Sequence, residues 1–257
     1  MLIDPTLDQM LAYCAGDPVE RVFLEDAARR GHSRFRAVLG DDGIEGLCYF
    51  GANVVPSGRG CWEFAGDAAN RSTRMIIGDE EAVSELWSSA QVVMPDPRED
   101  RPGQPVYVLD QPPEPGTSGL RAATFHDLDL LVPACAQTHE EELGVDPMKR
   151  DPVGFRRRTA AQIEEGRSWL WVENGRILFK AEASAWTPSA VQLQQVWVDR
   201  DVRQKGYATR GLSDLCRLLL EWTPTVCLFV RPENGPALRL YEKIGMRREG
   251  SYRSVLF

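Results

Sequence analysis

No lysine occurs in the first 116 of the 257 residues, the whole chain has three histidines, and none of its six cysteines forms a Cys-x-x-Cys pair. Scattered cysteines favour reduced, buried thiols over a disulfide framework or a zinc site. The histidines, His32, His126 and His139, do not have the spacing of metal ligands. We therefore expect a protein without a metal, in a reducing compartment.

Long apolar segments are also absent. No stretch approaches the roughly eighteen consecutive apolar residues that a membrane-spanning helix requires. The first residues, 1–8, lack the basic and apolar regions of a secretory signal. The apolar and charged fractions, 43% and 26%, are ordinary for a folded globular protein. We expect a cytoplasmic protein that does not use a membrane as its partner.

Charge is distributed unevenly along the chain. Residues 1–116 contain ten arginines and twenty acidic residues, a net charge of −10, whereas residues 117–257 carry a net charge of +2. Because nucleic-acid backbones bind clustered positive charge, nucleic acid is not the expected partner. An acidic surface attracts cations such as amines, although acidity also simply keeps proteins soluble.

Proline is dense between residues 94 and 119, where seven prolines occur. Within this segment only residues 106–109 have the pattern of a strand. Residues 113–119 read Pro-Glu-Pro-Gly-Thr-Ser-Gly, which is typical of an extended linker because proline restricts both itself and the preceding residue. We therefore predict an N-terminal domain in residues 1–112, a linker in residues 113–119 and a second domain in residues 120–257.

Apolar periodicity in the second half alternates between strand and helix. Strands are expected at residues 120–124, 168–173, 176–183, 191–198, 226–230 and 250–256, and helices at residues 127–142, 152–165, 209–222 and 236–244. The Asn174–Gly175 pair between two of these strands is a strong hairpin signal. This order predicts a mixed α/β (α+β) fold with a central twisted mixed sheet and helices on both faces.

The most informative segment is the turn between the strand at residues 191–198 and the helix after it. The turn contains Arg203, Lys205 and Gly206, two cations and a residue that adopts backbone conformations closed to others. Backbone N–H groups and the positive N-terminal end of the helix point at the same place, which favours phosphate binding. Solvated loop charges are the simpler interpretation of the two cations.

A second segment, about thirty residues later, gives this turn a context. The pattern Arg-x-x-Gly-x-Ala at residues 203–208 resembles the pyrophosphate loop of the GNAT superfamily of N-acetyltransferases. Residues 234–246 resemble the Asn-x-x-Ala-x-x-x-Tyr-x-x-x-Gly-Phe segment of the same superfamily, with methionine where phenylalanine is usual. Both motifs in this order make residues 120–257 resemble a GNAT domain that is preceded by an extra N-terminal domain.

The resemblance implies an N-acetyltransferase that moves an acetyl group from acetyl-CoA to a primary amine of a small molecule or protein by direct attack. The cofactor would lie where the strand before the loop splays from its neighbour, and Tyr241 would protonate the leaving sulfur as general acid. The residues that would contact the cofactor are Val196, Trp197, Val198, Arg203, Gln204, Lys205, Gly206, Tyr207, Ala208, Thr209 and Asn234. Packing is the competing interpretation of Tyr241 and Trp197, and helix capping that of Asn234.

The general base is the least defined part of the resemblance. Many members of the superfamily place a glutamate on the strand before the loop, but here residues 192–195 read Gln-Leu-Gln-Gln, and amides cannot take a proton from an ammonium. Glu182, on the preceding strand, is the nearest carboxylate by pattern and is the predicted base. An ordinary charged residue on a strand face, a water-mediated base and an already neutral amine are the alternatives. The missing glutamate also leaves open a non-catalytic acyl-CoA-binding regulatory protein.

The acceptor site in this fold is shaped by the connection between the first two helices of the domain. Here that connection, residues 139–147, contains three consecutive glutamates, which would attract a polyamine, a lysine side chain or an aminoglycoside. A solvated helix end is the competing interpretation. Basic residues at 149–150 and 156–158 favour instead an acceptor that is partly anionic, or contacts of these residues with phosphate.

The first half echoes the element order of the second, so we expect a degenerate GNAT-like domain there. Helices are predicted at residues 23–30 and 80–90 and strands at residues 35–39, 44–50 and 75–77. Residues 78–81, Gly-Asp-Glu-Glu, fall where a phosphate loop is expected, and their acids would repel pyrophosphate. We predict that this half does not bind CoA. It completes the acceptor cleft or forms an oligomer interface, which leaves room for a homodimer.

Overall fold

A computed structural model describes residues 1–32, 34–69 and 72–257 and shows one mixed sheet of twelve strands. The strands are β1 Leu2–Ile3, β2 Phe35–Leu39, β3 Ile44–Phe50, β4 Asn53–Gly58, β5 Met75–Asp79, β6 Glu99–Leu109, β7 Leu120–Ala122, β8 Ser168–Glu173, β9 Arg176–Trp186, β10 Val191–Val198, β11 Val226–Phe229 and β12 Arg247–Leu256. The helices are α1 Leu7–Cys14, α2 Val22–Arg29, α3 Ala65–Ala68, α4 Glu80–Ala90, α5 Leu128–Leu143, α6 Pro147–Arg150, α7 Pro152–Glu164, α8 Tyr207–Leu219 and α9 Gly235–Lys243. Short 3-10 turns are η1 Cys61–Phe64, η2 Phe125–Asp127 and η3 Arg200–Val202.

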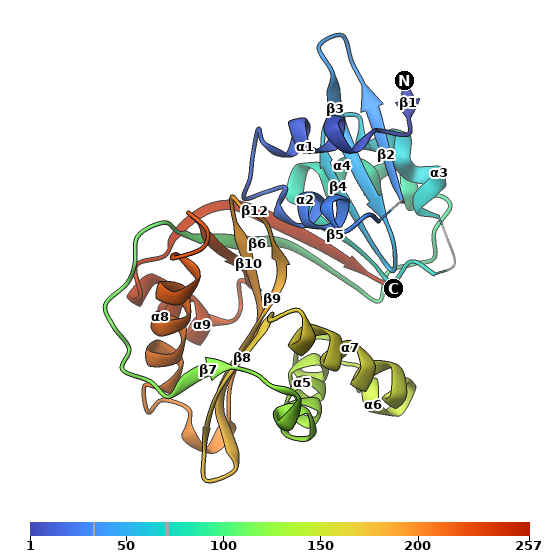
Figure 1. Cartoon of the computed structure of the whole chain (residues 1–257). Coiled ribbons are helices and arrows are strands. Elements are labelled where there is room, and N and C mark those ends of the chain that lie inside the picture. The colour runs from blue at the N-terminus through green and yellow to red at the C-terminus, as the bar shows by residue number, and fades with distance from the viewer. Residues whose placement is uncertain (33, 70–71) are drawn as a thin grey trace.

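The strand order is the same when it is followed inward from either edge of the sheet. It runs β1-β2-β3-β4-β5-β12-β6-β11-β10-β9-β8-β7, so β1 to β5 of the first half correspond to β7 to β11 of the second. Each half gives its last strand to the other, because β12 pairs with β5 and β6 pairs with β11. The two long strands cross the junction between the halves in Figure 1. The predicted mixed α/β fold is confirmed, and the first half repeats the fold of the second.

Strand β6 is longer than the sequence pattern predicts. It covers residues 99–109, and the expectation that only residues 106–109 form a strand was wrong. Pro102 and Pro105 lie in the part of β6 that pairs with β12 alone, whereas β11 pairs only with residues 106–109. Proline lacks the N–H of a ladder bond and is tolerated where a strand has one neighbour. The tertiary position of β6 therefore overrides its composition.

Most other predicted elements are present within a few residues of their expected bounds. The strands at residues 35–39, 44–50 and 191–198 and the helix at residues 80–90 match exactly. The sequence analysis missed α1 and β4 and the short elements β1, α3 and α6. Helix α1 is set by a capping box in which Thr6 and Gln9 each accept the backbone N–H of the other. The linker prediction for residues 113–119 covers part of the segment between β6 and β7, and its use as a domain boundary stays a prediction.

Helices cover both faces of the second half of the sheet. Helices α8 and α9 lie on one side of β8 to β10 and α5 to α7 on the other (Figure 1). Helix α8 buries Leu212, Leu215, Cys216 and Leu219, a stripe at helical spacing, against the sheet. Removing this stripe from water is what holds α8, and the loop before it, in place.

The two halves also share buried contacts. The Arg167 guanidinium donates two hydrogen bonds, of 3.0 and 2.7 Å, to the carboxylate of Asp26 in α2. The Tyr252 hydroxyl of β12 donates to the backbone oxygen of Glu20 at 2.9 Å. One apolar cluster combines residues of both halves, among them Val22 and Ala185. The position of one half on the other is therefore part of the folded core.

Candidate active site

Strands β10 and β11 run parallel but separate soon after they begin. They pair only at Val191–Val226 and Gln192–Cys227. Beyond these two pairs, residues 193–198 of β10 have no ladder partner on β11. The sheet is therefore split at this point, and the edge of β10 that faces the split carries backbone groups available to a ligand.

A β-bulge bends β10 at the same place. Gln194 is opposite Glu182 on β9, and the next pair is Trp197 with Lys180, so two residues of β10 stand against one of β9. Gln195 in the bulge has a φ of 50°, in the left-handed region. A bulge increases local twist and re-aims the residues beside it, which turns this end of β10 away from β11.

A cavity of about 360 Å³ opens at the split and reaches the first half of the chain. Its wall contains three of the predicted site residues, Val196, Asn234 and Tyr241, together with Gln194 and Gln195. The remaining wall includes Glu142 of α5 and residues of the first half such as Phe23, Asn53, Met75, Arg101 and Gln104. The cavity is thus built from both halves.

The loop before α8 has the geometry of an anion cradle. Gly206 is the N-cap of α8 with a φ of 85°, and no atom lies within 4 Å of where its Cβ would be. Gln204 also has a left-handed φ of 64°. Within the described parts of the chain, no protein group accepts a hydrogen bond from the N–H groups of residues 204–209. These donors at a helix N-terminus, with open space before them, fit a pyrophosphate.

The two cations of the loop, Arg203 and Lys205, make hydrogen bonds close to the loop. The Arg203 Nε donates to the Val198 oxygen at 3.1 Å, and its Nη2 donates to Glu141 of α5 at 3.2 Å. The Lys205 ammonium donates to the Asp201 oxygen at 3.1 Å. Both side chains are exposed, so their charge is available to an anion that enters the loop.

Two predicted cofactor residues use their side chains for packing. Trp197 is buried in the cluster beneath α5 and α7, with Leu131 and Leu170. The Tyr207 ring packs edge-on against Trp171, with ring centroids 4.9 Å apart. What Trp197 and Tyr207 present to a ligand is therefore their backbone, and Tyr207 also fixes the first turn of α8 on the sheet.

Asn234 and Tyr241 lie on α9 and both reach the cavity. The Asn234 side chain accepts the N–H of Ala237 at 3.3 Å, so the residue caps α9 and lines the cavity at once. Tyr241 is 6% exposed, its ring contacts Tyr107, and burial raises the pKa of its hydroxyl well above the usual value. That hydroxyl makes no hydrogen bond within the residues that the structure describes. Tyr241 is thus a protonated donor that faces the cavity.

Glu182 lies in a buried polar cluster beside the bulge. Cys135 donates its thiol to Glu182 Oε1 at 2.9 Å, and Lys180 Nζ lies 3.4 Å from the same oxygen and donates to Gln195 Oε1 at 2.8 Å. Lys180 is fully buried, and Glu182 is the carboxylate that pairs with it. Glu182 does not belong to the part of the cavity wall that is described. Its position gives Glu182 a structural partner in Lys180, and its role as the general base stays a prediction.

Replacing Glu182 by glutamine tests that structural assignment. The buried Lys180 ammonium would lose its counter-charge, so we expect the free energy of unfolding to fall by about 2 kcal/mol. Urea denaturation at pH 7.5 measures the loss, with Glu164→Gln on an exposed turn of α7 as the control for removal of one acid. Unchanged stability together with abolished transfer would favour the predicted base role instead.

The first half also contains two parallel strands that separate, but they do not place the phosphate loop at residues 78–81, where it was predicted. Strands β4 and β5 pair in parallel at residues 53–54 and 75–76, as β10 and β11 do. The turn from the end of β4 to η1, residues 58–60, therefore corresponds to the phosphate loop. Residues 78–81 instead end β5 and begin α4, the counterpart of α9. The expectation that residues 78–81 occupy the position of the phosphate loop was wrong, because the sequence analysis had missed β4.

The counterpart loop is occupied by protein groups. The N–H of Cys61, at the start of η1, donates to the Glu85 carboxylate at 3.1 Å. A Cβ on Gly58 would lie 2.2 Å from the Glu45 oxygen and 2.3 Å from the Tyr13 hydroxyl. The following elements η1 and α3 have four residues each, too short for a substantial helix dipole. The counterpart loop therefore lacks the open cradle seen at Gly206, and the expectation that the first half does not bind CoA stays a prediction.

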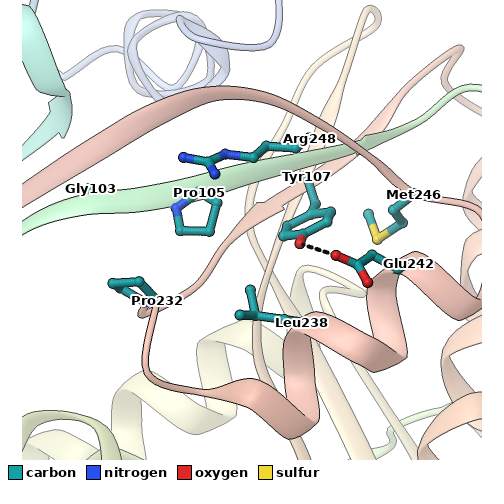
Figure 2. Close-up of a pocket in the computed structure, with 8 residues that line it drawn as sticks. All are labelled: Gly103, Pro105, Tyr107, Pro232, Leu238, Glu242, Met246 and Arg248. Carbon is teal, nitrogen blue, oxygen red and sulfur yellow. Dashed lines mark hydrogen bonds between the residues drawn. The ribbon is translucent and has the colours of Figure 1, made fainter.

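A second cavity, of about 440 Å³, lies between β6 and α9 (Figure 2). Figure 2 shows the Tyr107 hydroxyl pointing at the Glu242 carboxylate, to which it donates at 3.2 Å, with Arg248 of β12 beside β6. The wall contains none of the predicted site residues. We therefore place the candidate active site in the cavity at the split of the sheet.

Sequence reasoning missed Glu142, Arg101 and Gln104 as wall residues. Glu142 was noticed as one of three glutamates, without a signal that would separate it from its neighbours. Arg101 and Gln104 lie in the proline-dense segment and reach the cavity because β6 is inserted into the second half of the sheet. Sequence patterns carry little signal for such long-range exchange.

Comparison with known families gives two matches that together cover most of the chain. Residues 133–246 match the model of the acetyltransferase (GNAT) family. Residues 33–131 match a domain of unknown function, DUF4081. A search of the curated proteins finds no match. Within the described residues, no helix is long and apolar enough to span a membrane, and no group of three His, Cys, Asp or Glu is arranged for a metal ion.

Solved structures resemble the chain over nearly its whole length. An acetyltransferase of the GNAT family from Colwellia psychrerythraea has 11% identity and a TM-score of 0.61, covering 100% of this chain and 98% of its own. A GCN5-related N-acetyltransferase from Sphaerobacter thermophilus has 18% identity and a TM-score of 0.60, with 99% and 94% covered. A tandem GNAT protein from the clavulanic acid biosynthesis pathway has 12% identity and a TM-score of 0.57, with 97% and 93% covered. At these identities the likeness concerns the fold.

Proposed function

Residues 133–246 form a domain of the GNAT acetyltransferase family, which makes the chain an acyltransferase. On that premise we propose that the chain transfers an acetyl group from acetyl-CoA to a primary amine by direct attack. One observation carries the proposal. Strand β10 borders the split and leads through η3 into the open cradle at Gly206, and Tyr241 lines the cavity at the same split. A ligand with a pyrophosphate at one end and a thioester at the other fits that arrangement.

Each residue around the split has a defined part in the proposal. The N–H groups of residues 204–209, with Arg203 and Lys205, bind the pyrophosphate. The free edge of β10 at residues 196–198 pairs with the pantetheine arm, and a main-chain N–H there polarises the acetyl carbonyl. Asn234 contacts the arm, and Tyr241 donates a proton to the leaving sulfur. The chain's own residues therefore hold and polarise the thioester and protonate its leaving sulfur.

A non-catalytic acyl-CoA-binding regulatory protein is the second candidate. It is favoured by the amides of Gln192, Gln194 and Gln195, which line the cavity and cannot accept a proton from an ammonium. It predicts acetyl-CoA binding without turnover of any amine. The protonated Tyr241 that faces the cavity has no evident use in such a protein, so we prefer the enzyme.

Calorimetric titration with acetyl-CoA, followed by thiol detection with a panel of primary amines, tests the proposal. The panel contains butane-1,4-diamine, spermidine, 2-phenylethylamine, kanamycin and a lysine-containing peptide. Binding together with thiol release that depends on one of these amines supports the enzyme. Binding without thiol release from any of them favours the regulatory protein. If the full chain does not bind acetyl-CoA, both candidates are wrong.

A further inference from the structure

We propose that Glu142, at the C-terminal end of α5, is the general base that takes the proton of the acceptor amine, and that Arg101, donated by the first half, positions it. The inference rests on the proposed function and supplies the proton acceptor that the three glutamines of β10 cannot provide. Glu142 lines the same cavity as Tyr241 and the bulge residue Gln195. A base and an acid on facing walls of one cavity are what amide formation from a thioester requires.

The carboxylate of Glu142 is free to act. Its neighbour Glu141 binds Arg200 and Arg203, and Glu182 binds Lys180 and Cys135. Glu142 makes no side-chain hydrogen bond or ion pair with any residue in the described part of the chain. Of these three carboxylates, it alone combines a place in the cavity wall with an open side chain.

The backbone of Glu142 is held by two arginines from outside α5. Arg101 Nη2, on β6, donates to the Glu142 backbone oxygen at 3.0 Å. Arg231 Nη2, after β11, donates to the Glu141 backbone oxygen at 3.3 Å. These oxygens belong to the last turn of α5, where helix carbonyls have no partner of their own. The arginines cap the helix and hold its end over the cavity without engaging the Glu142 carboxylate.

The electrostatic setting suits a base that works near neutral pH. The Glu142 side chain is exposed and lines the cavity, and partial desolvation by the protein around it raises the pKa of the carboxyl to about 7. The charged and titratable groups around it are Lys180 and Glu182 of β9, Arg231, Arg101 of β6, Tyr241 of α9 and, on its own helix α5, His139. Glu182 adds to the upward shift of the pKa, while Lys180 and the two arginines oppose it.

The proposed step balances in protons and bonds. Glu142 takes one proton from the acceptor ammonium, and the neutral nitrogen bonds to the acetyl carbon. As the carbon–sulfur bond breaks, Tyr241 donates its proton to the sulfur, and the second nitrogen proton returns to the Tyr241 oxygen. Glu142 then releases its proton to water. The products are an N-acetyl amine, free CoA thiol and one solvent proton.

The variant Glu142→Gln tests the assignment in the full chain. We expect kcat/KM for transfer from acetyl-CoA to fall about 10²-fold at pH 8, with the dissociation constant of acetyl-CoA unchanged within twofold. The wild-type rate should rise with pH through about 7, because Glu142 must be ionised, and this limb should vanish in the variant. Glu142→Asp keeps a carboxylate and should recover about tenfold of the loss. Initial rates from pH 5.5 to 9 measure all three effects.

Glu140→Gln is the matched control. Glu140 lies on the same helix, is exposed and is outside the described cavity wall, so this change removes the same charge without removing the base. We expect wild-type rates and a wild-type pH profile. Arg101→Gln should lower the rate and weaken the binding of the amine, with acetyl-CoA binding retained, because the end of α5 loses a cap.

Melting temperatures separate loss of the base from loss of the fold. A carboxyl whose pKa is raised in the folded state is penalised when it ionises, so its cost to stability grows as pH rises through about 7. Glu142→Gln should therefore melt no lower than the wild type at pH 8 while it loses activity. An active wild type whose Glu142→Gln variant keeps its rate and pH limb would overturn this inference alone. A wild type that binds acetyl-CoA but acetylates no amine would overturn the proposed function and this inference with it.

Discussion

Replacement of Gly206 by glutamate is expected to weaken acetyl-CoA binding about 10³-fold. Gly206 is the N-cap of α8 in the left-handed region, and its Cβ position is open, so the new side chain has room to enter the cradle. The new carboxylate would accept hydrogen bonds from the backbone N–H groups that bind the pyrophosphate, and its negative charge would repel the pyrophosphate. Two like charges about 4 Å apart cost about 4 kcal/mol at an effective dielectric constant of 20, which corresponds to about three decades in affinity.

Calorimetric titration of the full-length variant measures this effect, and a second glycine controls for strain. A left-handed backbone costs a residue with a Cβ about 1–2 kcal/mol. Gly166, after α7, has a φ of 69° and no atom within 4 Å of its Cβ position, so Gly166→Glu carries the same strain and charge away from the cradle. Wild-type binding by Gly166→Glu is expected. Retained binding by a folded Gly206→Glu would show that the loop does not hold the pyrophosphate.

Removal of the Tyr241 hydroxyl should lower kcat about 10³-fold and leave acetyl-CoA binding nearly unchanged. Tyr241 lines the cavity, and burial raises the pKa of its hydroxyl well above the usual value, so the hydroxyl is a proton donor that no described residue engages. Loss of a general acid typically costs 10²- to 10⁴-fold in rate. The phenylalanine ring keeps the contact with Tyr107. Steady-state rates with detection of the CoA thiol give kcat, and calorimetry gives the affinity.

Tyr107→Phe is the control for Tyr241→Phe. It removes a hydroxyl from the ring that packs against Tyr241, but this hydroxyl donates to Glu242 and faces the second cavity. We expect kcat to stay within about twofold of the wild type. If Tyr241→Phe also retained the wild-type rate, Tyr241 would be a packing residue, and the proton of the leaving sulfur would come from water.

The cofactor side of the site was predictable because its motifs are local. The strand at residues 191–198, the turn at residues 203–206 and the helix after it are contiguous, so their chemistry is visible in a short window. The structure brings Val196, Asn234 and Tyr241 into one cavity wall as the motifs imply. Nothing in the sequence marks the bulge at Gln195, because a bulge depends on the register with β9.

The acceptor side was much less predictable because it depends on contacts between distant segments. Glu182 is the nearest carboxylate by sequence pattern, but the face of β9 on which it lies turns it toward the buried Lys180. Glu142 reaches the cavity because Arg101 and Arg231 hold the end of α5. These two arginines come from β6 and from the segment after β11. The residues next to them in the sequence give no sign that both contact the end of α5.

The sequence by itself determined most helices and strands of the second half and the loop at Gly206, because periodicity and capping act over a few residues. Two local motifs gave the resemblance to the GNAT acetyltransferases. Only the tertiary structure decided that β6 and β12 are exchanged, that the loop after β4 is filled by Glu85, and that both halves line one cavity. Strand exchange depends on the burial of whole faces of the sheet and on hydrogen bonds between the backbones of neighbouring strands. Nearly every residue contributes the same N–H and C=O groups to these bonds. That pairing leaves little trace in side-chain patterns.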